Sequence, residues 1–180
     1  SDTETLVSAF SQWGIEKTLN QLVGMFAIAV WNIKTKKLYL IRDRFGEKPL
    51  YYGWSNGIFL FGSELKALRS YKGFNNEIDR SSLSLYMQYM YVPSPYSIFK
   101  DIYKLDPGCI LEIDSIGAMQ SPKQITSFTF NSKGVGIKQW YSLSDIVKNS
   151  QNNLITDENE AVELLEETLL KSVQSQLISD

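Results

Sequence analysis

The segment Gly24–Gly53, GMFAIAVWNIKTKKLYLIRDRFGEKPLYYG, decides the fold of this chain. A first strand is expected over 25–32, where both alternating faces are largely apolar, as in a strand covered on each side. The lysine-rich stretch 33–37 predicts a solvated hairpin loop, and the apolar residues 38–41 return as a second strand. Pro49 restarts an aromatic third strand. The pattern therefore predicts antiparallel strands in an α+β protein.

A charged corner separates the second and third strands. It consists of Arg42-Asp43-Arg44, then Phe45-Gly46, with Glu47 and Lys48 beside them. A turn needs the glycine, but it does not need three consecutive charges next to a buried sheet. Two interpretations remain open, a buried ion-pair network or a binding surface, and the structural role is the more common of the two.

The N-terminal residues Ser1-Asp2-Thr3-Glu4 have the form of a capping box, with Asp2 in the positive first turn of a helix. Apolar residues at helical spacing continue to Gly14, a natural stop, and a second short helix is expected over 15–22. On the residues alone, Asp2 is interpreted as a carboxylate that satisfies the helix dipole.

Further elements follow at regular intervals. Asn56-Gly57 is a strong hairpin signal between two strands. Helices are expected over 63–69 and after the capping residue Asp79. The turn Asp106-Pro107-Gly108 leads into a strand at 109–113.

The composition becomes polar from Asp114 to Asn153, which predicts a connector with a hairpin rather than a core segment. Its strand-like pieces are 125–130 and 138–143. A long helix capped by Thr156-Asp157-Glu158 then carries an apolar stripe with no obvious partner.

The composition excludes several kinds of chemistry. The 180 residues include no histidine, which removes Ser–His–Asp and Cys–His catalysis and every histidine-based metal site. The one cysteine, Cys109, has no basic neighbour closer than Lys104 and is interpreted as a small core residue. A net charge of −2 gives no electrostatic footprint for nucleic acid, and no apolar run is long enough to span a bilayer. No nucleotide-binding or metal-binding motif is present.

Five motifs together resemble the glutamine-hydrolysing asparagine synthetases: SDTE at the N-terminus, GMFAIAVWN, RDRFGEKPLYYG, FGSELKAL and KLDPG. They correspond to the latter half of a class II glutamine amidotransferase domain. The resemblance implies part of an N-terminal-nucleophile hydrolase fold, an αββα sandwich of antiparallel sheets and flanking helices. It assigns residues 1–114 to that domain, 115–155 to a connector, and 156–180 to the first helix of a truncated ATP-dependent synthetase domain.

The resemblance also implies a mechanism. In this family an N-terminal cysteine thiolate attacks the glutamine amide, its own α-amino group acts as the base, and ammonia passes to a carboxylate activated by ATP and Mg²⁺. The acceptor is aspartate or, in related enzymes of surface-polysaccharide synthesis, a sugar carboxylate. Asp2 corresponds to the acid that receives the α-ammonium group of glutamine. The other matched positions are assigned to the scaffold: Arg42, Asp43, Arg44, Gly46, Pro49 and Glu64.

The nucleophilic cysteine, the arginine that clamps the glutamine carboxylate and the Asn-Gly oxyanion segment of the family have no counterpart in this sequence. We do not transfer the oxyanion role to Asn56-Gly57, and Cys109 is internal. The chain is therefore expected to be an inactive, cytoplasmic fragment without its own cofactor, which exposes apolar surface and self-associates. A non-catalytic interaction module is the alternative from another class.

Overall fold

A computed structural model describes residues 1–119 and 134–177, and the chain divides into two compact units, Ser1–Ser142 and Leu143–Asp180. The first unit contains two antiparallel sheets. One has the strand order β1-β2-β6-β7 and the other the order β4-β3-β5. The strands are β1 Ala27–Asn32, β2 Lys37–Arg42, β3 Tyr51–Ser55, β4 Ile58–Gly62, β5 Ile102–Lys104, β6 Cys109–Ile113 and β7 Val135–Gln139.

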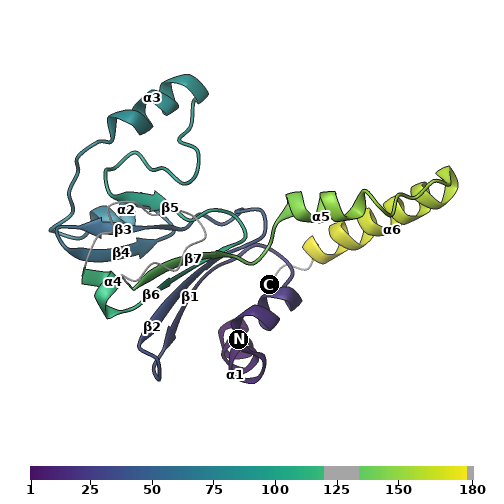
Figure 1. The fold of residues 1–180 in the computed structure, drawn as a ribbon, viewed down its shortest axis with the longest axis horizontal. Helices are drawn as coiled ribbons and strands as arrows, with labels where there is room; N and C mark the ends of the chain where they lie inside the picture. The colour runs from purple at the N-terminus through teal and green to yellow at the C-terminus, as the bar shows by residue number, and fades with distance from the viewer. Residues whose placement is uncertain (120–133, 178–180) are drawn as a thin grey trace. The chain divides into compact units, whose positions relative to one another are not determined.

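The helices of the first unit lie beside these sheets, except the third along the chain, which stands away from them (Figure 1). They are α1 Asp2–Gln21, α2 Leu65–Arg69, α3 Arg80–Tyr89 and the short α4 Ser115–Met119.

Three hydrophobic clusters show that these elements form four layers. The central cluster joins the inner faces of the two sheets, with Leu40 and Leu111 from one sheet and Tyr52 from the other. A second cluster packs Leu19 of α1 against the outer face of the β1-β2-β6-β7 sheet. A third packs Leu68 of α2 against the outer face of the β4-β3-β5 sheet. The α+β fold with an αββα layer order is therefore confirmed.

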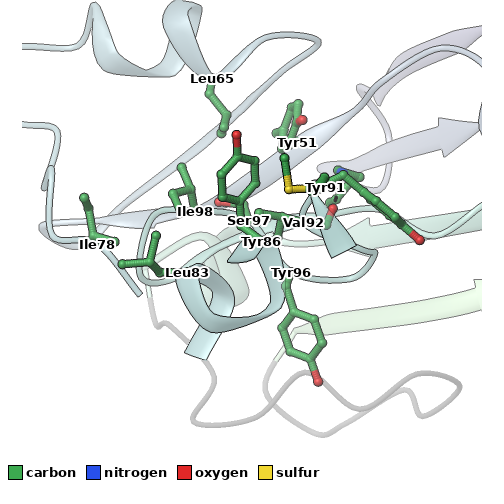
Figure 2. Close-up of a pocket in the computed structure, with 12 residues that line it drawn as sticks. Tyr51, Leu65, Ile78, Leu83, Tyr86, Tyr91, Val92, Tyr96, Ser97 and Ile98 are labelled. Carbon is green, nitrogen blue, oxygen red and sulfur yellow. Dashed lines mark hydrogen bonds between the residues drawn. The ribbon is translucent and has the colours of Figure 1, made fainter. Parts of the chain in front are cut away.

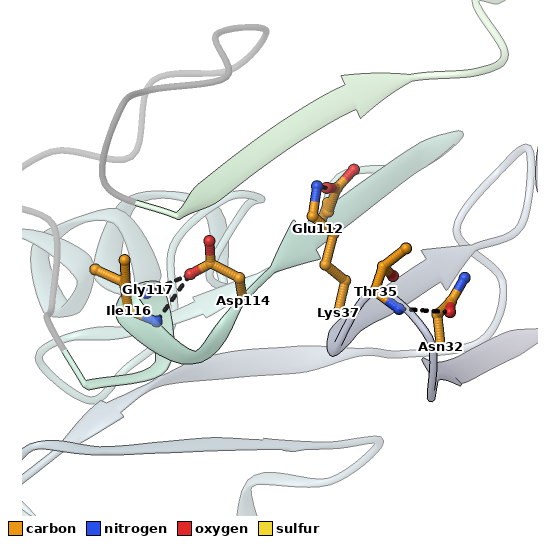
Figure 3. Close-up of polar contacts among 7 residues, drawn as sticks. All are labelled: Asn32, Thr35, Lys37, Glu112, Asp114, Ile116 and Gly117. Carbon is orange, nitrogen blue, oxygen red and sulfur yellow. Dashed lines mark hydrogen bonds and ion pairs between the residues drawn. The ribbon is translucent and has the colours of Figure 1, made fainter.

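The hairpins form where the sequence predicts them. Asn56 and Gly57 have φ angles of 50° and 78°, so a two-residue loop joins β3 to β4. In the β1–β2 loop, Asn32 Oδ1 accepts hydrogen bonds from the backbone N–H groups of Lys34 and Thr35. Figure 3 shows the bond from Thr35. Lys37 forms an ion pair with Glu112 on β6, and this contact raises the pKa of the lysine.

Helix α1 is broken at Gly14, whose φ of 78° is outside the helical range, so the predicted stop is confirmed. The capping box does not form as expected. Ser1 is the N-cap residue, but its side chain makes no capping bond, and Asp2 Oδ1 instead accepts from Thr3 N at 2.8 Å. Glu4 reaches the terminal amino group at 3.7 Å.

Strand β1 differs from its prediction on one face. The side that carries Ile28 packs beneath α1, as expected. On the opposite side Ala29 is exposed and Trp31 keeps 55% of its surface exposed. The pattern of two apolar faces was read as coverage on both sides. On the second face of β1, Ala27 packs against the central cluster, but the part that carries Ala29 and Trp31 is uncovered.

The segment expected to be a connector contributes to the core. Its residues 135–139 form β7, which pairs antiparallel with β6, and Val135 is buried in the central cluster. Asp114 Oδ1 accepts from the N–H groups of Ile116 and Gly117 at the start of α4, which precedes β7 (Figure 3). The strand-like piece at 125–130 lies outside the described residues.

The second unit consists of two helices, α5 Leu143–Ser150 and α6 Glu158–Gln176. Helix α5 falls where the sequence suggested only a connector. Asp157 caps α6 by accepting a hydrogen bond from Glu160 N at 2.9 Å. The apolar stripe of α6 is exposed, including Leu165 and Leu169. None of the helices in the described ranges is long and apolar enough to cross a membrane.

Candidate functional site

The charged corner is centred on the carboxylate of Asp43, which is fully buried. It accepts four hydrogen bonds from the backbone, at 2.9 Å from Glu47 N and Lys48 N, 3.2 Å from Phe45 N and 3.3 Å from Phe26 N. Burial by itself would raise the pKa of Asp43, but the N–H donors outweigh it and hold this pKa below its usual range. The carboxylate thus joins the start of β1 to the turn before β3.

Arg42 is 6% exposed and also bonds to the backbone. Its guanidinium donates to the carbonyl oxygens of Lys48 at 2.9 Å, Leu105 at 2.5 Å and Gly46 at 2.5 Å. These contacts join the corner to the end of β5. The corner is therefore a network of bonds to peptide groups rather than the ion-pair network that its charges suggested.

Arg44 connects the corner to α1. Its guanidinium donates to Leu22 O at 2.5 Å, and to Asn20 O and Leu19 O at 3.3 and 3.4 Å, so it satisfies carbonyl groups at the C-terminal end of the helix. It also lies 5.2 Å from the ring centre of Trp140 and 5.5 Å from that of Tyr141.

Trp140 and Tyr141 follow β7 and were not predicted as site residues. Trp140 Nε1 donates to Arg42 O at 3.2 Å, and its ring stacks on Phe26. The ring of Tyr141 packs edge-on against Phe45. Two adjacent aromatic residues in an otherwise polar stretch were the signal that this segment returns to the core.

The remaining scaffold residues have local roles. Gly46 has a φ of 69°, and a Cβ atom there would lie 2.8 Å from Pro107 and 2.9 Å from Arg42 Cζ, so a side chain would collide with the corner. Pro49 is exposed and precedes the buried Leu50 at the start of β3. Glu64 is exposed and is the N-cap residue of α2, without a side-chain capping bond.

Asp2 forms no described hydrogen bond or ion pair with the residues of the charged corner. It is exposed in the first turn of α1, whereas Arg44 binds the other end of that helix. Asp2 Oδ1 accepts from Thr3 N, and among the described residues Oδ2 has no protein partner. The structure thus supplies one exposed carboxylate at a helix N-terminus and a separate buried corner whose polar groups are already bonded.

Cys109 is 2% exposed at the start of β6, which confirms its assignment to the core. Burial raises the pKa of its thiol to about 12, and nearby Asp106 adds to the effect. The thiol is therefore protonated at neutral pH and is not activated as a nucleophile. Within the described part of the chain, no group of three or more His, Cys, Asp or Glu residues has the arrangement of a metal site.

We expect Cys109 of the folded chain to react with Ellman's reagent at least about a hundredfold more slowly than the same thiol in denaturant, because it is buried and protonated. The absorbance of released thionitrobenzoate measures both rates. Glutamine incubated with the folded chain should yield no ammonia above the background of a Cys109→Ala variant. Fast labelling of the native protein, or turnover that the variant loses, would contradict the assignment of this thiol to the core.

The family model that matches this chain and the relatives that resemble it agree on one family. Residues 1–124 match the family described as the glutamine amidotransferase domain. The chain is 39% identical over 108 residues to asparagine synthetase [glutamine-hydrolyzing] 1 of Bacillus subtilis, covering 60% of this chain and 17% of that protein. A putative asparagine synthetase [glutamine-hydrolyzing] of Mycobacterium tuberculosis is 36% identical over 115 residues, 62% of this chain and 18% of that protein.

Putative asparagine synthetase [glutamine-hydrolyzing] 2 of Methanocaldococcus jannaschii is 34% identical over 108 residues, which are 59% of this chain and 21% of that protein. The matched region thus spans about a fifth of each of these relatives. The family match itself covers more than half of the present sequence and includes Asp2 and the whole charged corner. This chain therefore belongs to the glutamine amidotransferase domain family.

Proposed function

We propose that this chain is part of a glutamine-dependent amidotransferase of the asparagine synthetase type, a ligase that hydrolyses glutamine and transfers its ammonia to an activated carboxylate. The family match over residues 1–124 carries the proposal. The two sheets and the buried corner supply the scaffold, and Asp2 supplies one contact to glutamine. The nucleophile and the acceptor site would come from segments of the parent protein beyond these 180 residues.

Asp2 is suited to bind the α-ammonium group of glutamine. Its carboxylate is exposed, and one oxygen already accepts a hydrogen bond from Thr3 N, which orients the group. The other oxygen is available for a charge-assisted hydrogen bond to a substrate cation. Asp2 also lies in the first turn of α1, where the helix dipole attracts a negative charge.

In the proposed parent enzyme, the α-amino group of an N-terminal cysteine takes the proton from its own thiol, and the thiolate forms a covalent bond to the glutamine carbonyl. The same proton passes to the leaving nitrogen, so ammonia is released. A synthetase domain, with ATP and Mg²⁺, would activate the acceptor carboxylate. We propose aspartate as the acceptor, since the relatives named above are asparagine synthetases. A sugar carboxylate is the second candidate within the same reaction type.

The 180-residue chain by itself is proposed to be inactive, because none of its described groups forms a complete catalytic constellation. The uncovered face of β1, with Trp31 55% exposed, supports the expectation that the isolated chain self-associates.

The coding sequence of the parent tests the proposal most directly. We expect a Met-Cys-Gly start upstream of Ser1 and an S-G-G-x-D-S loop downstream of Asp180. A natural start at Ser1 would instead favour a non-catalytic interaction module.

In the parent enzyme, Asp2→Asn should raise the KM for glutamine by about tenfold or more, because a charge-assisted bond to the α-ammonium group is lost. Glutaminase assays measure this, and synthesis with free ammonium should stay unchanged because it bypasses glutamine binding. Glu4→Gln is the matched control, since Glu4 is an exposed carboxylate in the same helical turn. The terminal amino group that Glu4 reaches in the 180-residue chain would be a peptide nitrogen in the parent, so the control loses no ion pair there. An unchanged KM in Asp2→Asn would refute the proposed contact.

A further inference from the structure

A pocket of about 620 Å³ lies beside α3, on the side of the first unit that carries the β4-β3-β5 sheet (Figure 2). Its walls come from α2, α3, the segment 90–98 and the strands β3 and β5. This volume is within the range of about 300–1,000 Å³ that small-molecule sites occupy. Neither Asp2 nor the residues of the charged corner line this pocket.

The pocket walls are apolar and rich in tyrosine. Tyr51 of β3, Leu65 of α2 and Tyr86 of α3 converge on it from three elements (Figure 2). Met90, the C-cap residue of α3, also lines it. Tyr86 and Met90 keep 42% and 77% of their surface exposed, so this apolar surface is not consumed by the protein's own core. Tyrosine rings and a flexible thioether favour a flat, apolar ligand body.

A single charged residue lines the pocket, Lys104 of β5. Its Nζ donates one hydrogen bond, to Val92 O at 2.9 Å, and lies 5.7 Å from the ring centre of Tyr51. An ammonium group has three N–H donors. Among the residues that the structure describes, no carboxylate forms an ion pair with it.

We propose that this pocket binds a small molecule with an aromatic body and one carboxylate, the body lying among Tyr51, Leu65 and Tyr86 and the carboxylate pairing with Lys104. Charge complementarity supports the carboxylate, because an anion there would gain a charge-assisted bond to an ammonium group that has no carboxylate partner among the described residues.

Two observations favour a singly charged carboxylate over a phosphate group. Phosphate recognition usually relies on several cations or on a fork of arginine donors, and this pocket offers one lysine. The hydroxyl of Ser97, which also lines the pocket, is already bonded to the backbone of Phe99 as donor and acceptor.

Calorimetric titration of the full 180-residue chain tests the proposal with two matched probes, 4-phenylbutyrate and its neutral amide. They share the aromatic body and differ in charge. We expect the carboxylate to bind at least about tenfold more tightly than the amide at pH 7. Equal affinities, or the absence of saturable binding of the carboxylate, would overturn the proposal without any variant.

Three variants then locate the binding. Lys104→Met should reduce the preference for the carboxylate to less than about twofold and leave the amide affinity unchanged. Lys100→Met is the control, since Lys100 pairs with Glu77 and does not line the pocket, and it should keep the full preference. Tyr86→Ala should weaken both probes. A preference that survives Lys104→Met, or that Lys100→Met also removes, would place the anion elsewhere and overturn the proposal. Glutamine is not involved, so the outcome is independent of the proposed amidotransferase reaction.

Discussion

Asp43→Asn is expected to lower the free energy of unfolding of the first unit by about 2–4 kcal/mol, although the change is nearly isosteric. Each oxygen of Asp43 accepts two backbone N–H groups. An asparagine keeps one oxygen and places an NH₂ group against the other two donors. Two hydrogen bonds are lost, and buried N–H groups are left facing another donor. Urea unfolding followed by tryptophan fluorescence measures the difference.

Asp101→Asn is the matched control for this experiment. Asp101 is exposed and has a φ of 59°, a conformation that asparagine also adopts readily. We expect its effect to stay within about 0.5 kcal/mol, as for most surface substitutions. Equal losses in Asp43→Asn and Asp101→Asn would show that the buried carboxylate does not hold the corner.

The effect of Asp43 also has a defined pH dependence. Its pKa is lower in the folded chain than the ordinary value of 3.8, so the ionised form stabilises the fold. The difference between the native protein and Asp43→Asn is therefore fully present above pH 3.8. It decreases as the pH falls through the lower pKa of the folded state. A difference that grew on acidification would have the wrong sign.

The hairpins and the kink of α1 could be predicted because local residues determine them. Asn56-Gly57 adopts the positive φ angles that its two-residue loop requires, and Gly14 does the same at the break in α1. The alternation in β1 also gave the correct strand and the side that faces α1.

Elements that depend on distant partners could not be predicted in this way. Strand β7 has five residues, including Gly136 and Lys138, and this composition does not predict a strand. The segment forms a strand because it pairs with β6. Trp31 is exposed because no described element covers that part of β1. An alternating apolar pattern predicts a strand but does not show which elements pack against it.

The candidate site shows the same division. The charges of the corner and its glycine were visible in the sequence, but their partners were not. Asp43 accepts a bond from Phe26, 17 positions earlier, and Arg42 donates to Leu105, 63 positions later. Because these partners are backbone groups, they have no signature in side-chain composition. Trp140, 98 positions from Arg42, did carry a signal, the aromatic pair Trp140-Tyr141, but its partner is the carbonyl oxygen of Arg42, which the sequence does not reveal.

The backbone contact at Gly53 should make its replacement the most damaging single change in the second sheet. A Cβ atom there would lie 2.1 Å from Asp101 O and 2.8 Å from Ile102 Cα, both main-chain atoms of the segment that pairs with β3. The same Asp101 carbonyl accepts a hydrogen bond from Trp54 N at 3.0 Å. Gly53→Ala can therefore be accommodated only if β5 moves away from β3. We expect a loss of about 3 kcal/mol or more in unfolding free energy, again measured in urea.

Gly62→Ala separates this effect from the general cost of adding a methyl group to the same sheet. Gly62 lies on β4, and its nearest neighbour to an added Cβ is the side-chain tip of Leu68 at 3.0 Å, which can shift. Its expected loss is below about 1 kcal/mol, because the lower entropy of the unfolded alanine chain offsets part of the crowding. If Gly53→Ala were as well tolerated as Gly62→Ala, the close approach of β5 to β3 would not occur in solution. The wall of the pocket that contains Tyr51 and Lys104 would then need a different arrangement, since those two residues are paired across the same two strands.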